Sequence, residues 1–593
     1  MQTLEEITGK LKADFNFSDA SIALMQDKGL LEDQKRYKVS DFLDALSLPK
    51  QTFAEKRKKS LLERTIERGD GQEITTGRYE RYVQDFKDIS SEQTLVQGRM
   101  KFAVEYVIGL TDLVSGYPQY GKFIDRPFTE EEKSKLRSIY GDYSIRDYSA
   151  VQMIEKRTKH DVVAANTWVT LRADELGIDP VLMRKVVHFA RTSEDNDANV
   201  KGELYMKALG KWTESLSKLV STLESKAREY INVTCIAETH GQAAQLTTLG
   251  HIYANLAEQI RLHAEPLLRE EMFRLEGKIA GAIGTDVDIK AALPVIPHRN
   301  IKDMYRRIVG DVFGLEYACL GNDQDHSNAA FARMLDTMVN VGMVVEKAAT
   351  DTWLYASRGV LAKKTEKGES GSSAMPQKAN PFLAEGAEAL QHIMRGMIQP
   401  IKDMVIAYRE QGDLRRSITK REAFHPIMLS IISIERLVEE INNYVPSIVE
   451  IEDAIYKMGP KIASSAVQTY LKAHGVEDSY DRIKHIVMKP YVEPDEVRAY
   501  ILSLHGGGRI DGSQADHIWF MIKGVIDTKN NRRNLMKAIS GEEVDAAVAD
   551  LTRVNSDIES RCYLLGTAVE DTELMILNAK QTQEMLERYE KSA

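Results

Sequence analysis

Apolar residues recur every three to four positions over long stretches of this chain, the spacing of one face of an α-helix. Three segments show it clearly, with apolar positions at Leu249, Ile252, Leu256 and Ile260; at Phe331, Leu335, Met338, Gly342 and Val345; and at Leu390, Ile393, Met394, Met397, Ile401 and Val405. Alternating strand patterns are nearly absent, and the 593 residues include only 15 prolines. The pattern therefore predicts an all-α protein with long helices around an apolar core.

Changes in this pattern divide the chain into four segments. Residues 1–70 look like a separate extension, in which the basic run 56–59 interrupts an acidic, leucine-containing sequence. We expect a helical N-terminal domain over 71–200, a central helical-bundle domain over 201–445, and a helical C-terminal domain with an extended tail over 446–593. A basic run is usually a solvated helix face, so the role of the extension stays open.

Composition narrows the function classes. Hydrophobic residues make up 43% and charged residues 28% of the chain, the balance of an ordinary globular protein. The net charge of −10 repels a phosphate backbone, so nucleic-acid binding is not expected. The N-terminus has no secretory pattern, no apolar run is long enough for a membrane span, and the three cysteines lack metal-ligand spacing. We expect a cytoplasmic protein with no membrane association and no bound metal.

The segment 368–385, GESGSSAMPQKANPFLAE, is the first candidate for chemistry. It begins as a hydrophilic, glycine-containing loop with two adjacent serines, of which Ser372 is the first, and a helix is predicted to begin near Pro381. Lys378 and Asn380 add a cation and an amide that suit a carboxylate ligand. A serine acts as a base only where such groups stabilise its alkoxide. The glycines also fit a lid that closes over a substrate.

Three further segments combine histidine, hydroxyl and carboxylate side chains. A histidine in a polar turn is more often structural, but its pKa near neutrality suits proton transfer. A hydroxyl followed by acids fits a helix cap, which is compatible with ligand contact. The candidates are His240 between Thr239 and Gln242, the triplet Lys159, His160 and Asp161, and the pair Thr192 and Ser193.

Together these motifs resemble the fumarase/aspartase superfamily. The stretch GSSAMPQKANP matches the superfamily signature G-S-S-x-M-P-x-K-x-N at every fixed position. The stretches THGQAAQLTTLG, IEKRTKHDVVA and TSED resemble the adenylosuccinate lyase family within it. The GRY region over residues 77–106 does so too, including the spacing to Arg99 and Glu105. The resemblance spans about residues 75–490.

The resemblance implies a three-domain, all-α subunit with a long central helical bundle, assembled as a homotetramer whose active sites are shared between subunits. The implied reaction is β-elimination of fumarate from N-succinyl purine nucleotides (adenylosuccinate to AMP, and SAICAR to AICAR), with no cofactor. Ser372 is the implied base, His240 the implied acid, and Glu385 the partner of an active-site histidine. The implied substrate-binding residues are Arg78, Tyr79, Lys159, His160, Asp161, Thr192, Ser193, Thr239, Gln242, Lys378, Asn380, Ser417 and Arg421.

The sequence departs from the family pattern at three positions. The usual substrate-binding arginine, a threonine–glutamine pair and the arginine before T-H are replaced by Gly412, Leu320 and Glu238. Arg415 and Arg416 are neighbouring candidates for the missing cation, and Gln324 for the missing amide. Each lost contact to a charged substrate costs on the order of a few kcal/mol.

The amine part of the substrate therefore stays open, and two alternatives remain. One is a lyase of the same superfamily that acts on another N-succinyl compound. The other is a catalytically silent structural or regulatory paralogue. Retention of the residues with implied chemical roles weighs against the silent paralogue, because a protein without activity has no need of all of them: Ser372, His240, Lys378, Asn380 and Glu385.

Overall fold

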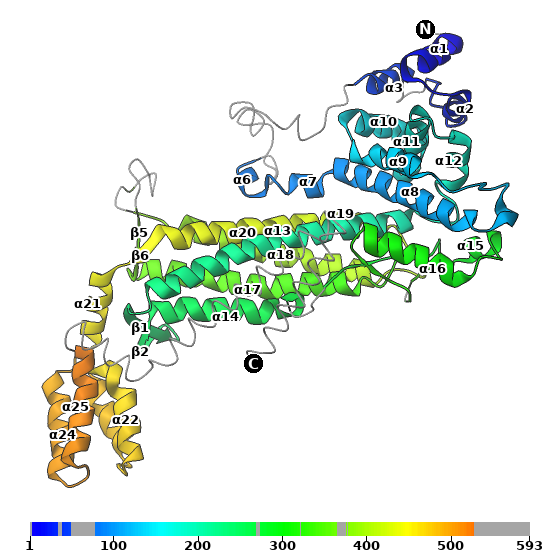
Figure 1. The fold of residues 1–593 in the computed structure, drawn as a ribbon. Coiled ribbons are helices and arrows are strands. Elements are labelled where there is room, and N and C mark those ends of the chain that lie inside the picture. The colour runs from blue at the N-terminus through cyan, green and yellow to red at the C-terminus, as the bar shows by residue number, and fades with distance from the viewer. Residues whose placement is uncertain are drawn as a thin grey trace.

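The computed structural model describes residues 3–33, 38–48, 77–268, 273–320, 322–364, 375 and 378–526. Helices make up nearly all of the regular structure in these residues, so the predicted all-α class is confirmed (Figure 1).

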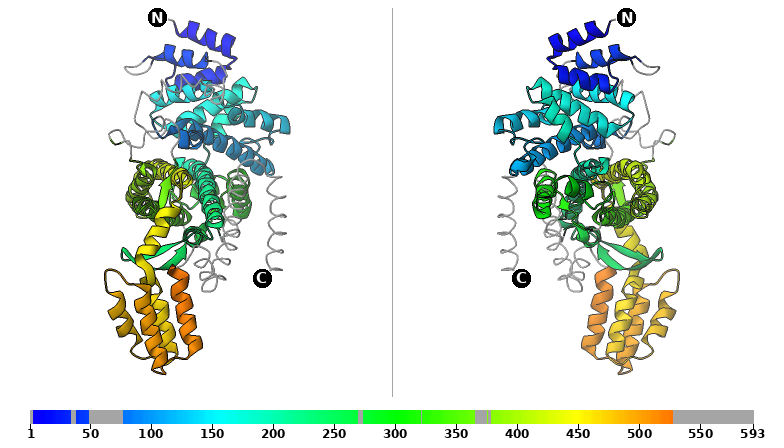
Figure 2. Two further views of the ribbon diagram at one scale, coloured as in Figure 1. Left: turned by 90° about the vertical axis from the view of Figure 1, so that its left-hand side faces the viewer. Right: turned by 90° about the vertical axis from the view of Figure 1, so that its right-hand side faces the viewer.

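Five long helices form a bundle at the centre of the molecule: α13 (Ser193–Glu229), α14 (Leu249–Leu268), α17 (Ala329–Ser357), α18 (Phe382–Ile406) and α20 (Phe424–Asn443). In this order each helix packs mainly on the next, and α20 closes the ring by packing on α13. Figure 2 views the bundle nearly along its helices. The three predicted apolar stripes lie on α14, α17 and α18, and the whole α17 stripe is buried.

Two short N-terminal helices, α6 (Glu80–Val83) and α7 (Lys87–Ser90), lie along the side of this bundle, on α20 and α13. The helices that follow cover one of its ends (Figure 1): α8 (Glu92–Ser115), α9 (Glu130–Gly141), α10 (Ile145–Thr158), α11 (Asp161–Glu175) and α12 (Pro180–Val186), with the 3₁₀ turn η2 (Pro118–Tyr120). After α14, the chain returns to this end through α15 (Val287–Ala292), α16 (His298–Arg306) and η3 (Arg307–Val312). Before α20, the short helix α19 (Arg415–Glu422) lies here too.

The first described helices are α1 (Leu4–Phe15), α2 (Asp19–Asp27) and α3 (Val39–Leu46), of which α2 packs against α11 and α12, and α3 against α10. Polar contacts fasten them there. The backbone N–H of Ser18 donates to Asp174 at 2.6 Å, and Arg157 Nε donates to the carbonyl of Gly29 at 2.9 Å. The described part of residues 1–70 therefore contacts the helices that follow it directly.

A small helical unit follows the bundle at its other end (Figure 1). It contains α21 (Ile448–Met458), η4 (Gly459–Ala463), α22 (Ser464–Ala473), α23 (Ser479–Val487), α24 (Pro494–Gly506) and α25 (Gly512–Ile526). None of the described helices combines the length and the apolar character that a membrane span requires.

Three pairs of short strands interrupt the helices. β3 (Glu276–Gly277) and β4 (Glu316–Tyr317) are parallel, and β5 (Leu361–Lys363) and β6 (Tyr444–Pro446) are antiparallel. β1 (Thr234–Thr239) and β2 (Gln242–Thr248) form a hairpin that the sequence pattern did not predict. Its two-residue turn is His240–Gly241, and both residues have positive φ, 56° and 69°, as a tight hairpin turn requires.

Candidate active site

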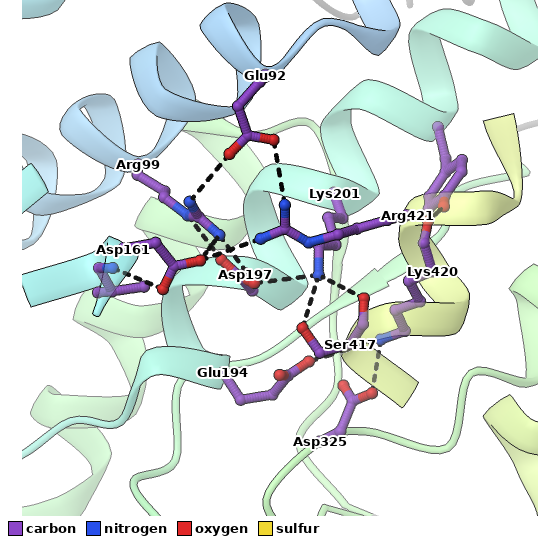
Figure 3. Close-up of polar contacts among 12 residues, drawn as sticks. Glu92, Arg99, Asp161, Glu194, Asp197, Lys201, Asp325, Ser417, Lys420 and Arg421 are labelled. Carbon is purple, nitrogen blue, oxygen red and sulfur yellow. Dashed lines mark hydrogen bonds and ion pairs between the residues drawn. The ribbon is translucent and has the colours of Figure 1, made fainter. Parts of the chain in front are cut away.

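Arg99 on α8 is the centre of a polar cluster where the N-terminal helices meet the bundle (Figure 3). Its guanidinium is almost fully buried and lies 2.6 Å from Asp161 and 3.0 Å from Asp197. Asp161 begins α11 and Asp197 lies near the start of α13, so one arginine joins three helices. Burial alone lowers the pKa of Arg99, but the two carboxylates outweigh burial and raise the pKa above its usual value. Arg99 is therefore a permanent positive charge.

Arg421 on α19 contacts the carboxylate of Asp161 from the side facing solvent. Its Nη2 lies 3.0 Å from Asp161 Oδ2, and its Nη1 lies 3.1 Å from Glu92. The side chain of Arg421 is 38% exposed and that of Asp161 is 27% exposed, so this edge of the cluster is open. Two predicted substrate-binding residues far apart in the sequence thus meet here.

Two lysines extend the cluster along α19. Lys201 Nζ donates to the hydroxyl of Ser417 at 3.3 Å and lies 3.1 Å from Asp197. Lys420 Nζ lies 2.6 Å from the fully buried carboxylate of Asp325. The chain around Ser417 is therefore fixed by ion pairs on both sides.

Glu194 is a carboxylate in this cluster whose charge is only partly balanced. Its side chain is 14% exposed, and the ammonium of Lys420 lies 3.7 Å from Oε1. Within the described residues Oε1 has no hydrogen-bond partner. Burial and then the charge of Asp325 raise the pKa of Glu194 to about 7. A carboxylate that exchanges protons near neutrality suits acid–base chemistry, and sequence reasoning did not single it out.

His160 and Ser193 meet at the edge of the cluster. The Nε2 of His160 lies 3.4 Å from Ser193 Oγ, and its Nδ1 lies 3.4 Å from Asp161. Thr192 forms the N-cap of α13 in a capping box with Asp195, the alternative recognised in the sequence. The KHD and TSED motifs are thus neighbours in the structure.

Asp195 fixes the start of α13, which carries Thr192 and Ser193. The TSED motif alone did not reveal this structural role. Asp195 is fully buried and accepts hydrogen bonds from the backbone N–H groups of Thr192, Ala280 and Gly281 at 2.8, 2.9 and 3.2 Å. The equally buried Lys278 lies 3.1 Å away. The stretch GKIAGAIGT therefore serves to hold the start of α13.

The THGQ motif lies at the other end of the bundle (Figure 1). His240 forms the tip of the β1–β2 hairpin, with Thr239 and Gln242 as the last strand pair before the turn, and all three side chains are exposed. The 37-residue α13 separates Ser193 from this hairpin, which corresponds to about 55 Å at the helical rise per residue. One chain therefore does not bring His240 to His160.

Two motif residues have the left-handed backbone that side chains rarely adopt. The φ of His240 is 56°, and that of Lys159, between α10 and α11, is 58°. Lys159 is exposed, and its backbone N–H caps α10. Such conformations cluster at functional sites because the fold must hold them in place.

Most of the signature stretch, including Ser372, lies outside the described residues. Lys378 and Asn380 are described, and α18 begins directly after Pro381, as predicted. Glu385, in the first turn of α18, accepts a hydrogen bond from Trp353 Nε1 at 3.1 Å. Among the described residues, no histidine contact of Glu385 is found.

Arg78 and Tyr79 of the GRY motif line a cavity of about 660 Å³ between α6, α20 and the start of α18. Its described lining combines four cationic side chains with a single carboxylate, the Glu439 that pairs with Arg81 at 2.9 Å. The cationic residues are Arg78, Arg81, Lys364 and Arg436. Aromatic rings of Tyr79, Tyr82 and Phe382 and the amides of Asn442 and Asn443 line the remainder. In a chain of net charge −10, this cavity suits a small anionic ligand.

Gly412 is closely packed by the side chains of Gln324 and Arg416. A Cβ built on Gly412 would lie 2.5 Å from Gln324 Oε1 and 2.8 Å from Arg416 Nη2. Arg416 is buried and lies over the ring of Tyr408 at 3.8 Å. Arg415 lies 2.7 Å from Asp413. Both candidates for the missing cation are therefore occupied within the chain.

The other two departures differ in their surroundings. Glu238 on β1 lies 2.6 Å from Arg358 at the end of α17, so it joins the hairpin to the bundle. Leu320 is 86% exposed.

Among the described residues, no group of three or more His, Cys, Asp or Glu side chains is arranged to hold a metal ion.

Comparison with known proteins agrees with this picture. A family model described as "Lyase" matches residues 128–395. The adenylosuccinate lyase of Dictyostelium discoideum is 25% identical over 416 residues, covering 69% of this chain and 86% of the relative. That of Escherichia coli K12 is 24% identical over 434 residues, covering 72% and 90%.

A solved structure shows the same fold. The 3-carboxy-cis,cis-muconate lactonizing enzyme from Pseudomonas putida matches with a TM-score of 0.59 and 14% identity, over 83% of this chain and all of the other. The resemblance and the lyase class predicted from the sequence are confirmed by these matches.

Proposed function

We propose that this chain, a lyase of the fumarase/aspartase superfamily, releases fumarate from N-succinyl purine nucleotides by β-elimination. Adenylosuccinate would give AMP, and SAICAR would give AICAR. The observation that carries the proposal is the convergence of the KHD, TSED and 417–421 motifs. Asp161 contacts Arg421, and His160 contacts Ser193, at the open edge of one charged cluster.

The chemistry assigns a step to each group. Ser372, assigned from the resemblance, removes the Cβ proton beside a carboxylate of the succinyl group, and the electron pair forms the new double bond as the C–N bond breaks. His240 donates a proton to the departing nitrogen. Lys378 and Asn380 stabilise the dianionic carboxylate that forms before the bond breaks. These roles need no cofactor.

The cavity at Arg78 and Tyr79 fits the charge of this substrate. An N-succinyl nucleotide carries a phosphate and two carboxylates, and the described residues of the cavity offer four cations against one carboxylate. Aromatic rings beside the cations suit a nucleotide, because they stack on a base or a ribose face.

The distances within one chain support shared active sites. The proposed acid His240 and the His160 cluster lie at opposite ends of α13, so in this proposal a complete site combines residues of more than one subunit. The bundle helices also expose large apolar side chains that a homotetramer would cover: Leu262, Met343, Trp353, Ile393, Met404 and Ile406.

The proposal is tested by incubating the purified chain with adenylosuccinate, SAICAR and a panel of N-succinyl amino compounds without a nucleotide. We expect fumarate from the two nucleotides and none from the panel, and no fumarate with Ser372→Ala or His240→Ala. Turnover of the panel alone would instead establish a lyase for another N-succinyl compound. If no compound releases fumarate, the remaining interpretation is a catalytically silent paralogue.

A further inference from the structure

Two side chains of α20 hold the first turn of α18 from the side. Arg436 Nη2 donates to the backbone carbonyl of Phe382 at 3.0 Å. One turn further along α20, Glu440 Oε1 accepts from the backbone N–H of Ala384 at 3.4 Å, and the N–H of Leu383 also favours the charged form of this carboxylate. Side chains of α20 therefore bind backbone N–H and C=O groups within the first turn of α18.

This contact replaces the cap that α18 lacks. The N-cap position is Pro381, which has no side chain able to accept a hydrogen bond, and no side-chain cap is formed. The first backbone N–H groups of a helix have no partner inside it, and a negative charge near them is favourable. Glu440 supplies both the acceptor and the charge from a neighbouring helix.

The pair is built into the core rather than placed on the surface. Glu440 is fully buried, and Arg436 is 7% exposed. Within the described residues, neither Glu440 Oε2 nor Arg436 Nε has a hydrogen-bond partner. Gly386 has no side chain where Arg436 crosses α18, and any Cβ there would collide with the guanidinium. Burying an incompletely paired carboxylate is costly, so a role beyond packing is expected.

The turn that they hold lies between the groups proposed for chemistry. Lys378 and Asn380 immediately precede α18, and Glu385 lies in its first turn with its carboxylate on Trp353. A rotation of this turn would move all three groups together. Arg436 also lies over the ring of Tyr79, at 5.7 Å, and so links the turn to the cationic cavity.

We propose that Arg436 and Glu440 are positioning residues for the elimination, which orient Lys378, Asn380 and Glu385 through the first turn of α18. The inference rests on the proposed function for its catalytic consequence, but the contact itself does not.

The contact between Glu440 and the first turn of α18 is sensitive to pH. Burial raises the pKa of Glu440 to about 7, against the lowering effects of the α18 backbone N–H groups, Lys363 on β5 and Arg436 on its own helix. Above pH 7 the carboxylate is charged and binds the helix start strongly. Below pH 7 it is protonated and becomes a weaker acceptor, so the orientation is lost as the pH falls.

Three variants test this: Glu440→Gln, Glu440→Ala and Arg436→Lys. The matched control is Glu435→Gln, on the opposite side of α20, where Glu435 accepts from Ser215 at 2.7 Å and pairs with Lys218. Thermal unfolding establishes which variants are folded. Glu440→Ala should lower kcat about 10- to 100-fold with less than a threefold change in KM, because misplaced groups lose rate more than binding. Glu440→Gln should remove the fall of kcat below pH 7, and the control should behave as wild type.

Amide hydrogen exchange at Leu383 and Ala384, corrected for the intrinsic pH dependence, tests the contact without turnover. Wild type should lose protection below pH 7, Glu440→Ala should lack it at every pH, and Glu440→Gln should show no pH dependence. A wild type that releases fumarate while these variants keep its pH profile and protection would overturn the positioning role alone. A wild type without activity would overturn the proposed function, and the exchange pattern would still decide the contact.

Discussion

The carboxylate of Asp161 lies 2.6 Å from the guanidinium of Arg99, at the place where helices α8, α11 and α13 meet. The arginine is buried, whereas the aspartate is 27% exposed and also binds Arg421. One partner is therefore structural and the other faces the open edge of the site. This asymmetry separates the effects of mutating the two residues.

Asp161→Asn should keep the fold and lose activity. Arg99 retains Asp197, so the stability change should be about 1 kcal/mol or less, as for a partly exposed pair. Loss of one charge-assisted contact, about 1.5–3 kcal/mol, should reduce kcat/KM for adenylosuccinate about 10- to 100-fold. Fumarate release and thermal unfolding measured on the same sample decide this. A fully active Asp161→Asn enzyme would remove Asp161 from the site.

Arg99→Met should instead destabilise the fold by about 3–5 kcal/mol, because it leaves a buried carboxylate without its main partner. Arg126→Met is the control, since Arg126 pairs with Glu132 on the surface and its loss should cost much less stability. Urea unfolding measures both. Equal losses of stability in the two variants would contradict the structural role of Arg99.

Gly412→Ala should destabilise the protein by about 1–3 kcal/mol, because the added Cβ overlaps Gln324 and Arg416. Gly9→Ala, in α1, is the matched control, since a Cβ there meets nothing within 4 Å. We expect no loss of stability for the control in the same unfolding assay. A stable and more active Gly412→Ala would show that the close packing is not required.

Acid should weaken the fold through His326. Burial lowers its pKa to about 4, and its Nδ1 accepts the backbone N–H of Asn328 at 3.1 Å, which requires the neutral ring. The unfolded chain binds the proton near pH 6.5, so the folded state loses stability as pH falls from 6.5 to 4, by up to about 3 kcal/mol. His326→Gln should show a smaller loss over this range in pH-dependent urea unfolding. Parallel curves for the two proteins would exclude His326 as the cause.

Co-expression of two inactive variants should give a mixed oligomer that regains activity. His240→Ala and His160→Ala damage groups at opposite ends of the bundle, so a mixed oligomer contains some sites with both residues intact. Recovery of fumarate release in the purified mixed oligomer, but not on mixing the folded proteins briefly, is expected. Activity no higher than that of the separate variants would contradict shared sites.

The sequence predicts the helices well because their apolar spacing is local information. The stripe from Leu390 to Val405 lies on α18, and the start of α18 after Pro381 follows from proline's preference for helix beginnings. The β1–β2 hairpin was missed, because its turn depends on a left-handed histidine rather than on a usual Asn-Gly pair.

The site was predicted as motifs, and the structure supplies their contacts. Asp161 and Arg421 are 260 positions apart, and no local pattern indicates that they touch. The same holds for Asp195 and Lys278, whose pairing requires the full packing of α13 against the following loop. The sequence also does not reveal that Arg416, four positions after Gly412, is buried against the ring of Tyr408.

The most direct measurement is the product balance when the purified chain is mixed with adenylosuccinate. We expect AMP and fumarate in equal amounts, with no reaction by His240→Ala. Wild-type protein that leaves adenylosuccinate unchanged, in a preparation shown to be folded, would contradict it.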